Sequence, residues 1–409
     1  MRWINTERLQ ELLAHISGNI HSNFYDKKYT GLPVDEEHFF DLPPLTREDL
    51  ISTPVHERLY VPKADVRFVA FTSGTSTGKP LMVPFADVER YYFEPSLGTG
   101  VTRPLIIHPP LMKSFGHTFL QQCRQAHSPV SPVFGDLQNM DNNALLFKEL
   151  ACDAVYSLPT IAGLFADAAK RWGIAQQVKL LVVSSEMLTA ARRADLQSSF
   201  PAARIANIYG SAELGQLLFF PCPRMMEEDA NQFHVVTEAI AVIELIENEL
   251  VITYGLNRAM PLLRYRTGDY FEEISTGCVC GLPGPVLAWS HRTDIDRLKL
   301  NGIEFNVEDS DRAFAVFPHL ARVPYQIHFR PAPGSTAVGL AVEVVAQGPQ
   351  AEDLARFAEQ ELPQAWKLTS TATLRTAIER GLVSSFEVRA VPEVSAPSVK
   401  VKRFINHVV

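Results

Sequence analysis

Residues 72–80 read Thr-Ser-Gly-Thr-Ser-Thr-Gly-Lys-Pro, directly after the apolar run Val-Arg-Phe-Val-Ala-Phe at 66–71. The apolar run predicts a β-strand, and Leu-Met-Val-Pro-Phe at 81–85 predicts a second strand after the loop. Glycines let a backbone approach an anion closely, hydroxyl and backbone N–H groups donate to its oxygens, and a lysine adds positive charge. The stretch is therefore predicted to be a phosphate-binding loop between two strands.

The spacing excludes a phosphate loop of the Walker type. That motif has four residues between its glycines and a Ser or Thr after its lysine. Here three residues separate Gly74 from Gly78, and Pro80 follows Lys79. Loops of this composition also occur in ordinary hairpins, so the rest of the chain has to decide between the two interpretations.

Three further polar motifs follow in the chain and support the first interpretation. They are Tyr-Gly-Ser-Ala-Glu at 209–213, Tyr-Arg-Thr-Gly-Asp at 265–269, and His-Arg-Thr-Asp at 291–294, the last followed by Lys-Leu-Asn-Gly at 299–302. In order and rough spacing the four motifs resemble those of the adenylate-forming enzymes, the superfamily of acyl-CoA synthetases and adenylation domains. The Arg-Tyr-Arg-Thr-Gly-Asp run at 264–269, the Cys-Val-Cys-Gly turn at 278–281 and the modest length resemble its phenylacetate–CoA ligase branch. The resemblance covers most of the chain, from about residue 45 onward.

The composition is that of a soluble globular protein. Of the 409 residues 46% are hydrophobic and 21% charged, and the net charge is −8. This charge argues against a role in coating nucleic acid. No stretch approaches the ~20 apolar residues of a membrane span, and the N-terminus lacks a signal-peptide core. Five cysteines in a chain of this length predict free or metal-bound thiols in a reducing cytoplasm. We therefore expect a cytoplasmic protein without a membrane or nucleic-acid partner.

Strands and helices alternate from residue 66 to about residue 220, and the strands are nearly continuous in apolar residues. This pattern predicts an α/β fold with mainly parallel sheets covered by helices. Adjacent short strands within 234–275 predict an antiparallel subdomain. Near the N-terminus, one helix is expected over residues 5–27 and a second, short helix capped by Thr46.

After about residue 292 the pattern shifts to a smaller α+β unit. We place the boundary at Asp294, which gives a core of residues 1–293 and a small, mobile C-terminal domain of residues 294–409. In the superfamily this domain rotates between two half-reactions, and hinges absorb such motion at a few residues. By resemblance Asp294 is the hinge, and Gly302 lines the channel for the thiol.

The resemblance also implies how ATP would be bound. Activation of a carboxylate is an in-line attack on the α-phosphorus that releases pyrophosphate, so the protein must hold the triphosphate and neutralise its charge. Glu213 would bind Mg²⁺, since a hard cation prefers carboxylate oxygen, Asp269 would accept from the ribose hydroxyls, and Tyr209 would pack on adenine. The family has Thr or Ser where Ala212 stands, so either Ser211 replaces that hydroxyl or the contact is missing. The implied nucleotide-binding residues are Ser73, Gly74, Thr75, Ser76, Gly78, Lys79, Tyr209, Gly210, Ser211, Glu213, Asp269 and Arg292.

A lysine near the C-terminus would complete the first half-reaction. Lys400 aligns best with the family's catalytic lysine, three residues before Arg403, although Val399 stands where the family has glycine. Lys402 is the second candidate, because alternate residues of a strand share one face.

The acid itself would be recognised by segments 114–117, 184–187 and 209–214. Phe115, His117 and Met187 indicate an apolar or aromatic pocket, and Ser185 and Glu186 belong to the second segment. Each of these residues also fits an ordinary core position.

A separate set of residues predicts a metal site. Cys222, His234, Cys278 and Cys280 supply three thiols and one imidazole, a tetrahedral set for structural zinc. The alternative is buried free cysteines and a surface histidine, because the two-residue gap usual in zinc sites is absent. Cys123 and Cys152 lie on helical patterns and are assigned to the core.

Together these features predict an ATP-dependent acid–thiol ligase. A carboxylic acid, aryl or acyl or an amino acid, would become an acyl-adenylate and then a thioester on CoA or on the phosphopantetheine of a carrier protein. ATP, Mg²⁺ and the thiol are the implied cofactors; the sequence leaves a homodimer open. One alternative is an enzyme that passes the acyl group to an amine or hydroxyl. The other is a degenerate nucleotide-binding homologue without turnover. Ala212 and Glu304 support this alternative, because the family has Thr or Ser at the first position and frequently Arg at the second.

Overall fold

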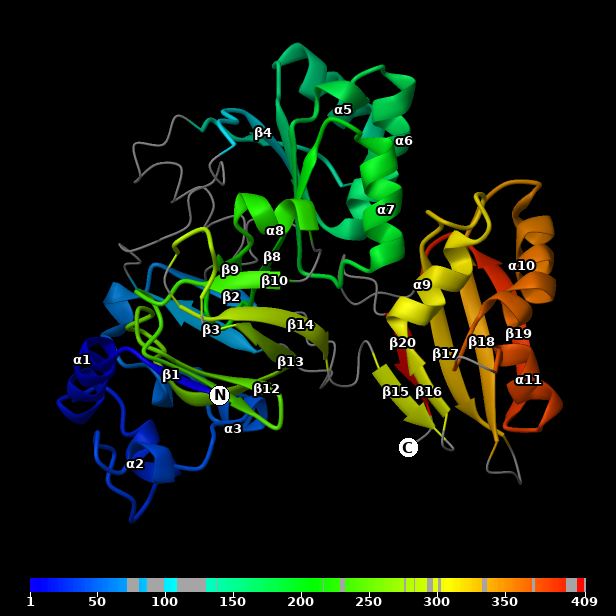
Figure 1. Cartoon of the computed structure of the whole chain (residues 1–409). Coiled ribbons are helices and arrows are strands. Elements are labelled where there is room, and N and C mark those ends of the chain that lie inside the picture. The colour runs from blue at the N-terminus through cyan, green and yellow to red at the C-terminus, as the bar shows by residue number, and fades with distance from the viewer. Residues whose placement is uncertain are drawn as a thin grey trace.

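The structure of the protein is a computed structural model. It describes residues 1–71, 81–86, 99–108, 130–137, 139–215, 217–228, 232–275, 277–282, 284–292, 297–300, 303–332, 337–369, 372–394 and 403–407. Two bodies are visible in Figure 1: a larger N-terminal unit, residues 1–292, and a C-terminal unit, residues 297–407. None of the helices in these ranges is long and apolar enough to cross a membrane.

The chain begins with an edge strand and several short helices. Helix α1 ends at Gly18, whose N–H donates to the carbonyl oxygen of Ala14 at 3.2 Å, and the next helix begins at Phe24. The single helix expected over residues 5–27 is therefore wrong, because residues 18–23 interrupt it. Thr46 caps α3 in a reciprocal capping box with Asp49, as expected. These elements are β1 Arg2–Ile4, α1 Thr6–Ser17, α2 Phe24–Lys28, η1 Phe39–Asp41, α3 Arg47–Ser52, η2 Val55–Glu57 and η3 Lys63–Asp65.

One twelve-stranded sheet runs through the N-terminal unit, in the order β1-β11-β12-β13-β14-β10-β9-β8-β7-β6-β4-β5. The strands from β8 to β5 are parallel, as the alternating pattern predicts, and the others are antiparallel. The predicted antiparallel region is therefore continuous with the parallel one, joined where β9 pairs with β8. The strands are β4 Pro104–Ile107, β5 Val133–Phe134, β6 Ala154–Ser157, β7 Leu180–Ser184, β8 Arg204–Gly210, β9 Leu217–Phe220, β10 Gln232–Val235, β11 Val242–Ile246, β12 Glu249–Tyr254, β13 Leu262–Ser275 and β14 Val286–Arg292.

Alternate residues of the parallel strands enter two different cores. Leu105, Val155 and Leu181 pack on one face of the sheet beneath three helices. Ile106 and Val182 pack on the opposite face with Met226. Both faces are thus covered, which explains why these strands are apolar throughout. The helices are α5 Met140–Glu149, α6 Pro159–Arg171, η4 Ala175–Gln177, α7 Ala190–Ser199 and α8 Pro223–Glu228, and Figure 1 shows α5, α6 and α7 together on one side.

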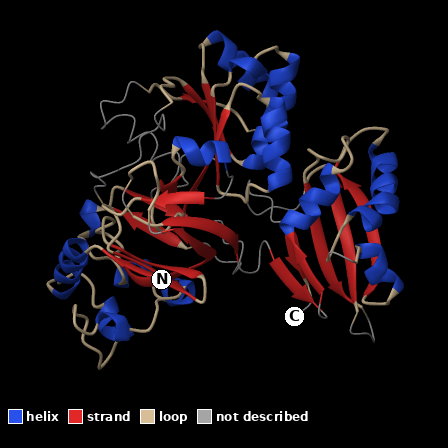
Figure 2. Ribbon diagram, in the orientation of Figure 1, coloured by secondary structure: helices blue, strands red, loops and turns tan. Residues whose placement is uncertain are grey.

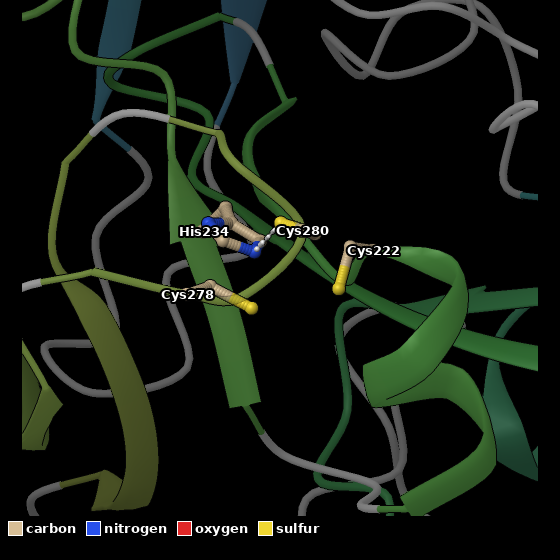
Figure 3. Close-up of side chains that lie close together, drawn as sticks. All are labelled: Cys222, His234, Cys278 and Cys280. Atoms are coloured by element: carbon tan, nitrogen blue, oxygen red, sulfur yellow. Dashed lines mark hydrogen bonds between the residues drawn. The ribbon is translucent and has the colours of Figure 1, made fainter.

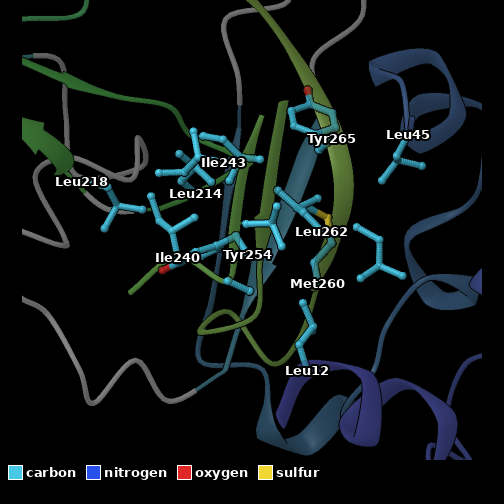
Figure 4. Close-up of a cluster of buried hydrophobic side chains, with 14 of the residues drawn as sticks. Leu12, Leu45, Leu214, Leu218, Ile240, Ile243, Tyr254, Met260, Leu262 and Tyr265 are labelled. Carbon is cyan, nitrogen blue, oxygen red and sulfur yellow. The ribbon is translucent and has the colours of Figure 1, made fainter. Parts of the chain in front are cut away.

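The largest core lies under the antiparallel strands. Leu12 of α1, Leu45, Tyr254, Leu262 and Tyr265 belong to it, and Figure 4 shows their side chains gathered over β12 and β13. The hairpin of β2 Phe68–Phe71 and β3 Met82–Phe85 contributes Ala70, Val83 and Phe85 to the same cluster. This hairpin confirms that residues 72–80 join two antiparallel strands.

The C-terminal unit is a smaller α+β body with its own core. A four-stranded sheet, in the order β19-β18-β17-β20, packs against helices that Figure 2 draws in blue on one side. Trp366, Phe305 and Tyr325 are among its buried side chains. The α/β fold with a small C-terminal region is thus confirmed, whereas the boundary at Asp294 stays a prediction, because residues 293–296 lie outside the described ranges. The elements are β15 Arg297–Leu300, β16 Ile303–Asn306, α9 Val307–Ala315, β17 Tyr325–Pro331, β18 Val338–Val345, α10 Ala351–Ala365, α11 Leu374–Glu379, β19 Val383–Val391 and β20 Phe404–Asn406.

Candidate functional site

Glu213 lies in a tight turn after the last parallel strand, β8. The carbonyl oxygen of Ser211 accepts from the N–H of Gly215 at 3.1 Å, and the Ser211 hydroxyl oxygen accepts from the N–H of Leu214 at 3.4 Å. Gly215 has φ +66°, and a Cβ there would overlap the ring of Phe85. Only glycine fits this close approach of the turn to β3. The carboxyl ends of parallel strands are where open α/β sheets bind ligands.

The carboxylate of Glu213 is buried and ion-paired. It is 6% exposed, and its Oε1 accepts from Arg47 Nη1 at 2.8 Å and from the Tyr265 hydroxyl at 3.1 Å. Arg47 is the first residue of α3, and the preceding Leu45 exchanges two backbone hydrogen bonds with β13 on either side of Tyr265. The sequence analysis missed both partners, since 166 and 52 residues separate them from Glu213.

Asp269 lies on β13 and is also buried, at 3% exposure. Its Oδ2 accepts from the Tyr209 hydroxyl at 2.6 Å, so the motifs at 209–213 and 265–269 meet in space. The ring of Tyr209 packs edge-on against Phe219 and Phe271. Its proposed contact with adenine and the ribose role of Asp269 stay predictions. Arg292 pairs in register with Asp269 across β13 and β14, which places its backbone beside the predicted ribose site.

The predicted acid-binding segment follows β7. Ser185 has φ +73°, an uncommon conformation for a residue other than glycine. Glu186 Oε2 accepts from the N–H of Thr160, in the first turn of α6, at 3.0 Å. Met187 packs against the core of the C-terminal unit.

The remaining predicted site residues lie outside the described ranges. The β2–β3 hairpin brackets the phosphate loop, with Phe71 opposite Met82 as the pair nearest to it. The residues outside are Ser73, Gly74, Thr75, Ser76, Gly78, Lys79, Phe115, His117, Asp294, Gly302, Lys400 and Lys402.

The four predicted metal ligands come together. Cys222, His234, Cys278 and Cys280 present their ligand atoms within 4.8 Å of one another. Figure 3 shows the four side chains gathered in one place. β10 brings them together: His234 pairs with Phe220 of β9, two residues before Cys222, and with Val286 of β14, just after the cysteine turn. The surface position of the histidine in the alternative interpretation is wrong, because His234 is 1% exposed and faces the cluster.

The geometry of this cluster suits zinc. Zn–S bonds of ~2.3 Å and Zn–N bonds of ~2.0 Å place the ligand atoms of a tetrahedron roughly 3.5 Å apart. Cys280 Sγ lies 3.3 Å from His234 Nε2. A hydrogen bond from the backbone N–H of Cys280 is the main cause that lowers the pKa of the Cys278 thiol. Burial lowers the pKa of His234, which favours the neutral imidazole that metals bind.

Known proteins with a related sequence or fold are CoA ligases. No known protein-family profile matches the sequence. Phenylacetate–coenzyme A ligase of Thermus thermophilus is 26% identical over 369 residues, which cover 81% of this chain and 78% of the relative. The fold matches 2-hydroxyisobutyryl-CoA ligase with 2-HIB-AMP in its postadenylation state, at a TM-score of 0.73 and 15% identity, over 98% of this chain and 89% of that chain.

The same enzyme with 2-HIB-AMP and CoA in its thioesterification state gives a TM-score of 0.62 at 15% identity, over 98% of this chain and 88% of that chain. O-succinylbenzoate coenzyme A synthetase of Bacillus subtilis, with ATP and magnesium ion, gives a TM-score of 0.54 at 15% identity. The match covers 82% of this chain and 68% of that chain. In sequence, fold and motif order the chain is similar to members of the adenylate-forming CoA ligase superfamily. Within that superfamily it resembles the phenylacetate–CoA ligases.

Proposed function

We propose that the protein activates a carboxylic acid with ATP and transfers the acyl group to a thiol. The observation that carries this proposal is the pair of buried carboxylates, Glu213 and Asp269, at the positions that the superfamily uses for metal and ribose. Each accepts a hydrogen bond from a tyrosine hydroxyl. Such preorganisation is what a site needs if it is to stabilise charge without moving.

In the first half-reaction a carboxylate oxygen attacks the α-phosphorus of ATP, and pyrophosphate leaves. Asp269 would accept hydrogen bonds from the ribose hydroxyls, and its own bond to Tyr209 fixes the carboxylate on β13. Glu213, whose Oε1 accepts from Arg47 and Tyr265, would be a ligand of Mg²⁺. When bound, Mg²⁺ would neutralise charge on the phosphates. Lys79 and the loop hydroxyls would hold the β- and γ-phosphates, and Lys400 would contact the reacting groups.

In the second half-reaction the thiol sulfur attacks the carbonyl carbon of the acyl-adenylate, the bond to AMP breaks, and a thioester forms. Rotation of the C-terminal unit at Asp294 would remove Lys400 and open a channel lined by Gly302. The described arrangement of the two units would belong to the first half-reaction, in keeping with its higher likeness to a postadenylation state.

The substrate is an aryl or acyl acid, and the acceptor is CoA or a carrier-protein thiol. Phe115 and His117 of the predicted acid segments favour an apolar or aromatic acid, whereas Met187 packs into the C-terminal core. Cysteines without disulfides in the described residues suit a reducing cytoplasm, the location we propose. A homodimer is compatible with the fold.

We also propose that Cys222, His234, Cys278 and Cys280 bind one structural Zn²⁺. Cys278 and Cys280 lie between β13, which carries Asp269, and β14, which carries Arg292. A metal there would fix the far end of this pair of strands relative to β9 and β10.

A pyrophosphate-exchange screen across aryl, short acyl and amino acids tests the ligase proposal. Exchange that depends on one class of acid, followed by AMP release that depends on added CoA, is the expected result. Exchange with AMP release on an amine or hydroxyl would support the alternative acceptor. Nucleotide binding without exchange for any acid would point to a degenerate homologue.

A further inference from the structure

The joint between the two units contains a buried polar network centred on Asp311. This residue lies on α9, which packs beside α7 in Figure 1. Its Oδ2 accepts from the Thr189 hydroxyl at 2.9 Å, and its Oδ1 accepts from the Tyr325 hydroxyl at 2.6 Å. Arg192 and Arg403 lie 3.9 Å from Oδ1. Thr189 and Arg192 belong to the N-terminal unit, so one carboxylate connects the two units.

Arg403 makes a second connection across the joint. Its Nη1 donates to the carbonyl oxygen of Tyr325 at 3.2 Å, and its guanidinium lies 4.3 Å from the centre of the Tyr325 ring. Its Nη2 lies 3.5 Å from the Thr160 hydroxyl in the N-terminal unit. The backbone N–H of that threonine donates to Glu186, so Arg403 is two contacts from the predicted acid segment.

Residues 185–189, which extend the predicted acid segment 184–187 by two residues, are held from both sides of the joint. Thr189 ends the segment: its hydroxyl oxygen accepts from the N–H of Arg192 as the cap of α7 while the hydroxyl donates to Asp311. Glu308 of α9 accepts from the N–H of Ala190 at 3.3 Å. Met187 packs into the C-terminal core. One polar contact and one apolar contact therefore hold this segment from the C-terminal unit, and a second polar contact holds Ala190 directly after it.

Separation of the units would leave these groups poorly paired. Asp311, Arg192 and Arg403 are 6%, 5% and 8% exposed. Asp311 would lose its contacts with Thr189 and Arg192, and water would replace them. The segment would lose its Thr189 anchor and its apolar support in the same step. Order of the segment and docking of the C-terminal unit thus change together.

We propose that the C-terminal unit forms part of the acid-binding site, with Asp311 and Arg403 as positioning residues that order segment 185–189. The proposal rests on the ligase function proposed above. Because binding free energies are reciprocal, an acid that needs the ordered segment also favours the docked arrangement. A filled acid site would therefore draw the C-terminal unit into the arrangement of the first half-reaction.

Arg322 allows this coupling to be tested from a distance. It lies in the C-terminal unit, and its Nε donates to Asp195 at 2.9 Å and 3.1 Å. Its other two nitrogens donate to Asp167 and Ser199. Asp195 and Ser199 belong to the second half of α7, six and ten residues beyond Thr189, which corresponds to roughly 9–15 Å along a helix. Arg322 thus supports docking without touching the acid segment.

Hydrogen–deuterium exchange of the full chain, without ligand, is the deciding measurement. Arg322→Gln should raise the exchange rate of peptides covering 185–192 by about 3- to 10-fold, since a network of partly exposed ion pairs is lost from the joint. Arg389→Gln is the matched control, because Arg389 is an exposed arginine of the same unit, paired only within it to Glu387. This control should leave exchange in 185–192 unchanged. A peptide covering β6 reports that the fold is intact.

Faster exchange in α9 of Arg322→Gln, with unchanged exchange in 185–192, would show that docking and segment order are independent and would overturn the proposal. If the exchange rate changes in neither region of Arg322→Gln, Asp311→Asn is measured in the same way. An exchange rate in 185–192 of that variant equal to the wild-type rate would then also overturn the proposal. The measurement needs no turnover. Absence of pyrophosphate exchange with every acid would refute the ligase function and leave this result interpretable.

Discussion

Glu213, the carboxylate proposed to bind Mg²⁺, is held by residues that are remote from it in the sequence. Arg47 comes from an N-terminal helix and Tyr265 from the middle of the large sheet, yet both donate to the same oxygen. Leu45 holds the start of α3 next to β13, because its backbone forms a β-bridge with Tyr265. The free energy of the ion pair therefore depends on the whole N-terminal unit.

Glu213→Gln should lower the rate of adenylate formation by about 10²-fold or more, since the amide cannot neutralise charge that builds on the phosphates. The structure buries Glu213 against Arg47. We therefore also expect a loss of about 1–3 kcal/mol in the free energy of unfolding. Single-turnover kinetics and denaturant unfolding measure the two effects. Glu48→Gln, an exposed change on α3, is the control, and an equal rate in both variants would remove Glu213 from the mechanism.

Asp269→Asn should weaken ATP binding by roughly 10- to 100-fold, because a charge-assisted bond to the ribose is lost. The same variant should lose most of its preference for ATP over 2′,3′-dideoxy-ATP, which has no hydroxyls to donate. Isothermal titration with both nucleotides gives the preference directly. Glu273→Gln changes an exposed carboxylate on the same strand and should retain it. A preserved preference in Asp269→Asn would place the ribose elsewhere.

At the scale of elements, the turn after β8 depends on one glycine. Gly215→Ala should destabilise the protein by about 1–3 kcal/mol, because it forces a left-handed residue against Phe85. Gly277→Ala is a suitable comparison, since its Cβ would meet no atom within 4 Å. Thermal unfolding of the two variants measures the difference. Equal midpoints would mean that the turn can move away from β3 without cost.

The cysteine cluster connects three segments, and a metal there should be visible in both content and stability. We expect about one equivalent of zinc per chain by elemental analysis. Cys278→Ser should lower the zinc content and the melting temperature, whereas Cys152→Ser, in the core beneath the helices, should keep the zinc. Protein that is purified without metal and has the same stability as the Cys278→Ser variant would contradict the proposal.

The sequence predicted elements well where local pattern decides them. Apolar strands between helices correctly indicated the parallel half of the sheet, and the loop at 72–80 does join two strands. The split of the first helix at Gly18 was missed because amphipathic spacing continued through it. The continuity of parallel and antiparallel strands was missed as well, since pairing of β8 with β9 follows a turn whose shape depends on Phe85, far away in the chain. The cluster of Cys222, His234, Cys278 and Cys280 was predicted because its residue types are chemically distinctive, whereas Arg47 is one of many surface-like arginines in the sequence.

At the scale of the whole molecule, the joint between the units should respond to acid. Burial alone would raise the pKa of Asp311, but Arg403, Arg192 and the hydrogen bonds outweigh burial and lower this pKa. A lowered pKa in the folded state contributes stability above the unfolded value of ~3.9, and this contribution is lost as the pH falls through the folded value. Asp311→Asn should therefore be less stable than wild type at pH 7 and lose less stability between about pH 5 and pH 3. Denaturant midpoints at several pH values test this, with the exposed Asp353→Asn as control. Parallel acid profiles for wild type and Asp311→Asn would contradict it.

The position of β1 in the large sheet determines how long this strand lacks its pairing partner during synthesis. β1 forms one edge by pairing with β11, and the contact between Arg2 and Glu244 spans 242 residues. At about 5–20 residues per second, a ribosome would need roughly 12–50 s to make the partner strand after the first one has been translated. During that time the segment that forms β1, with Trp3 and Ile4, cannot pair with β11. The N-terminal segment of the nascent chain is thus accessible to chaperones before β11 has been made and can pair with it.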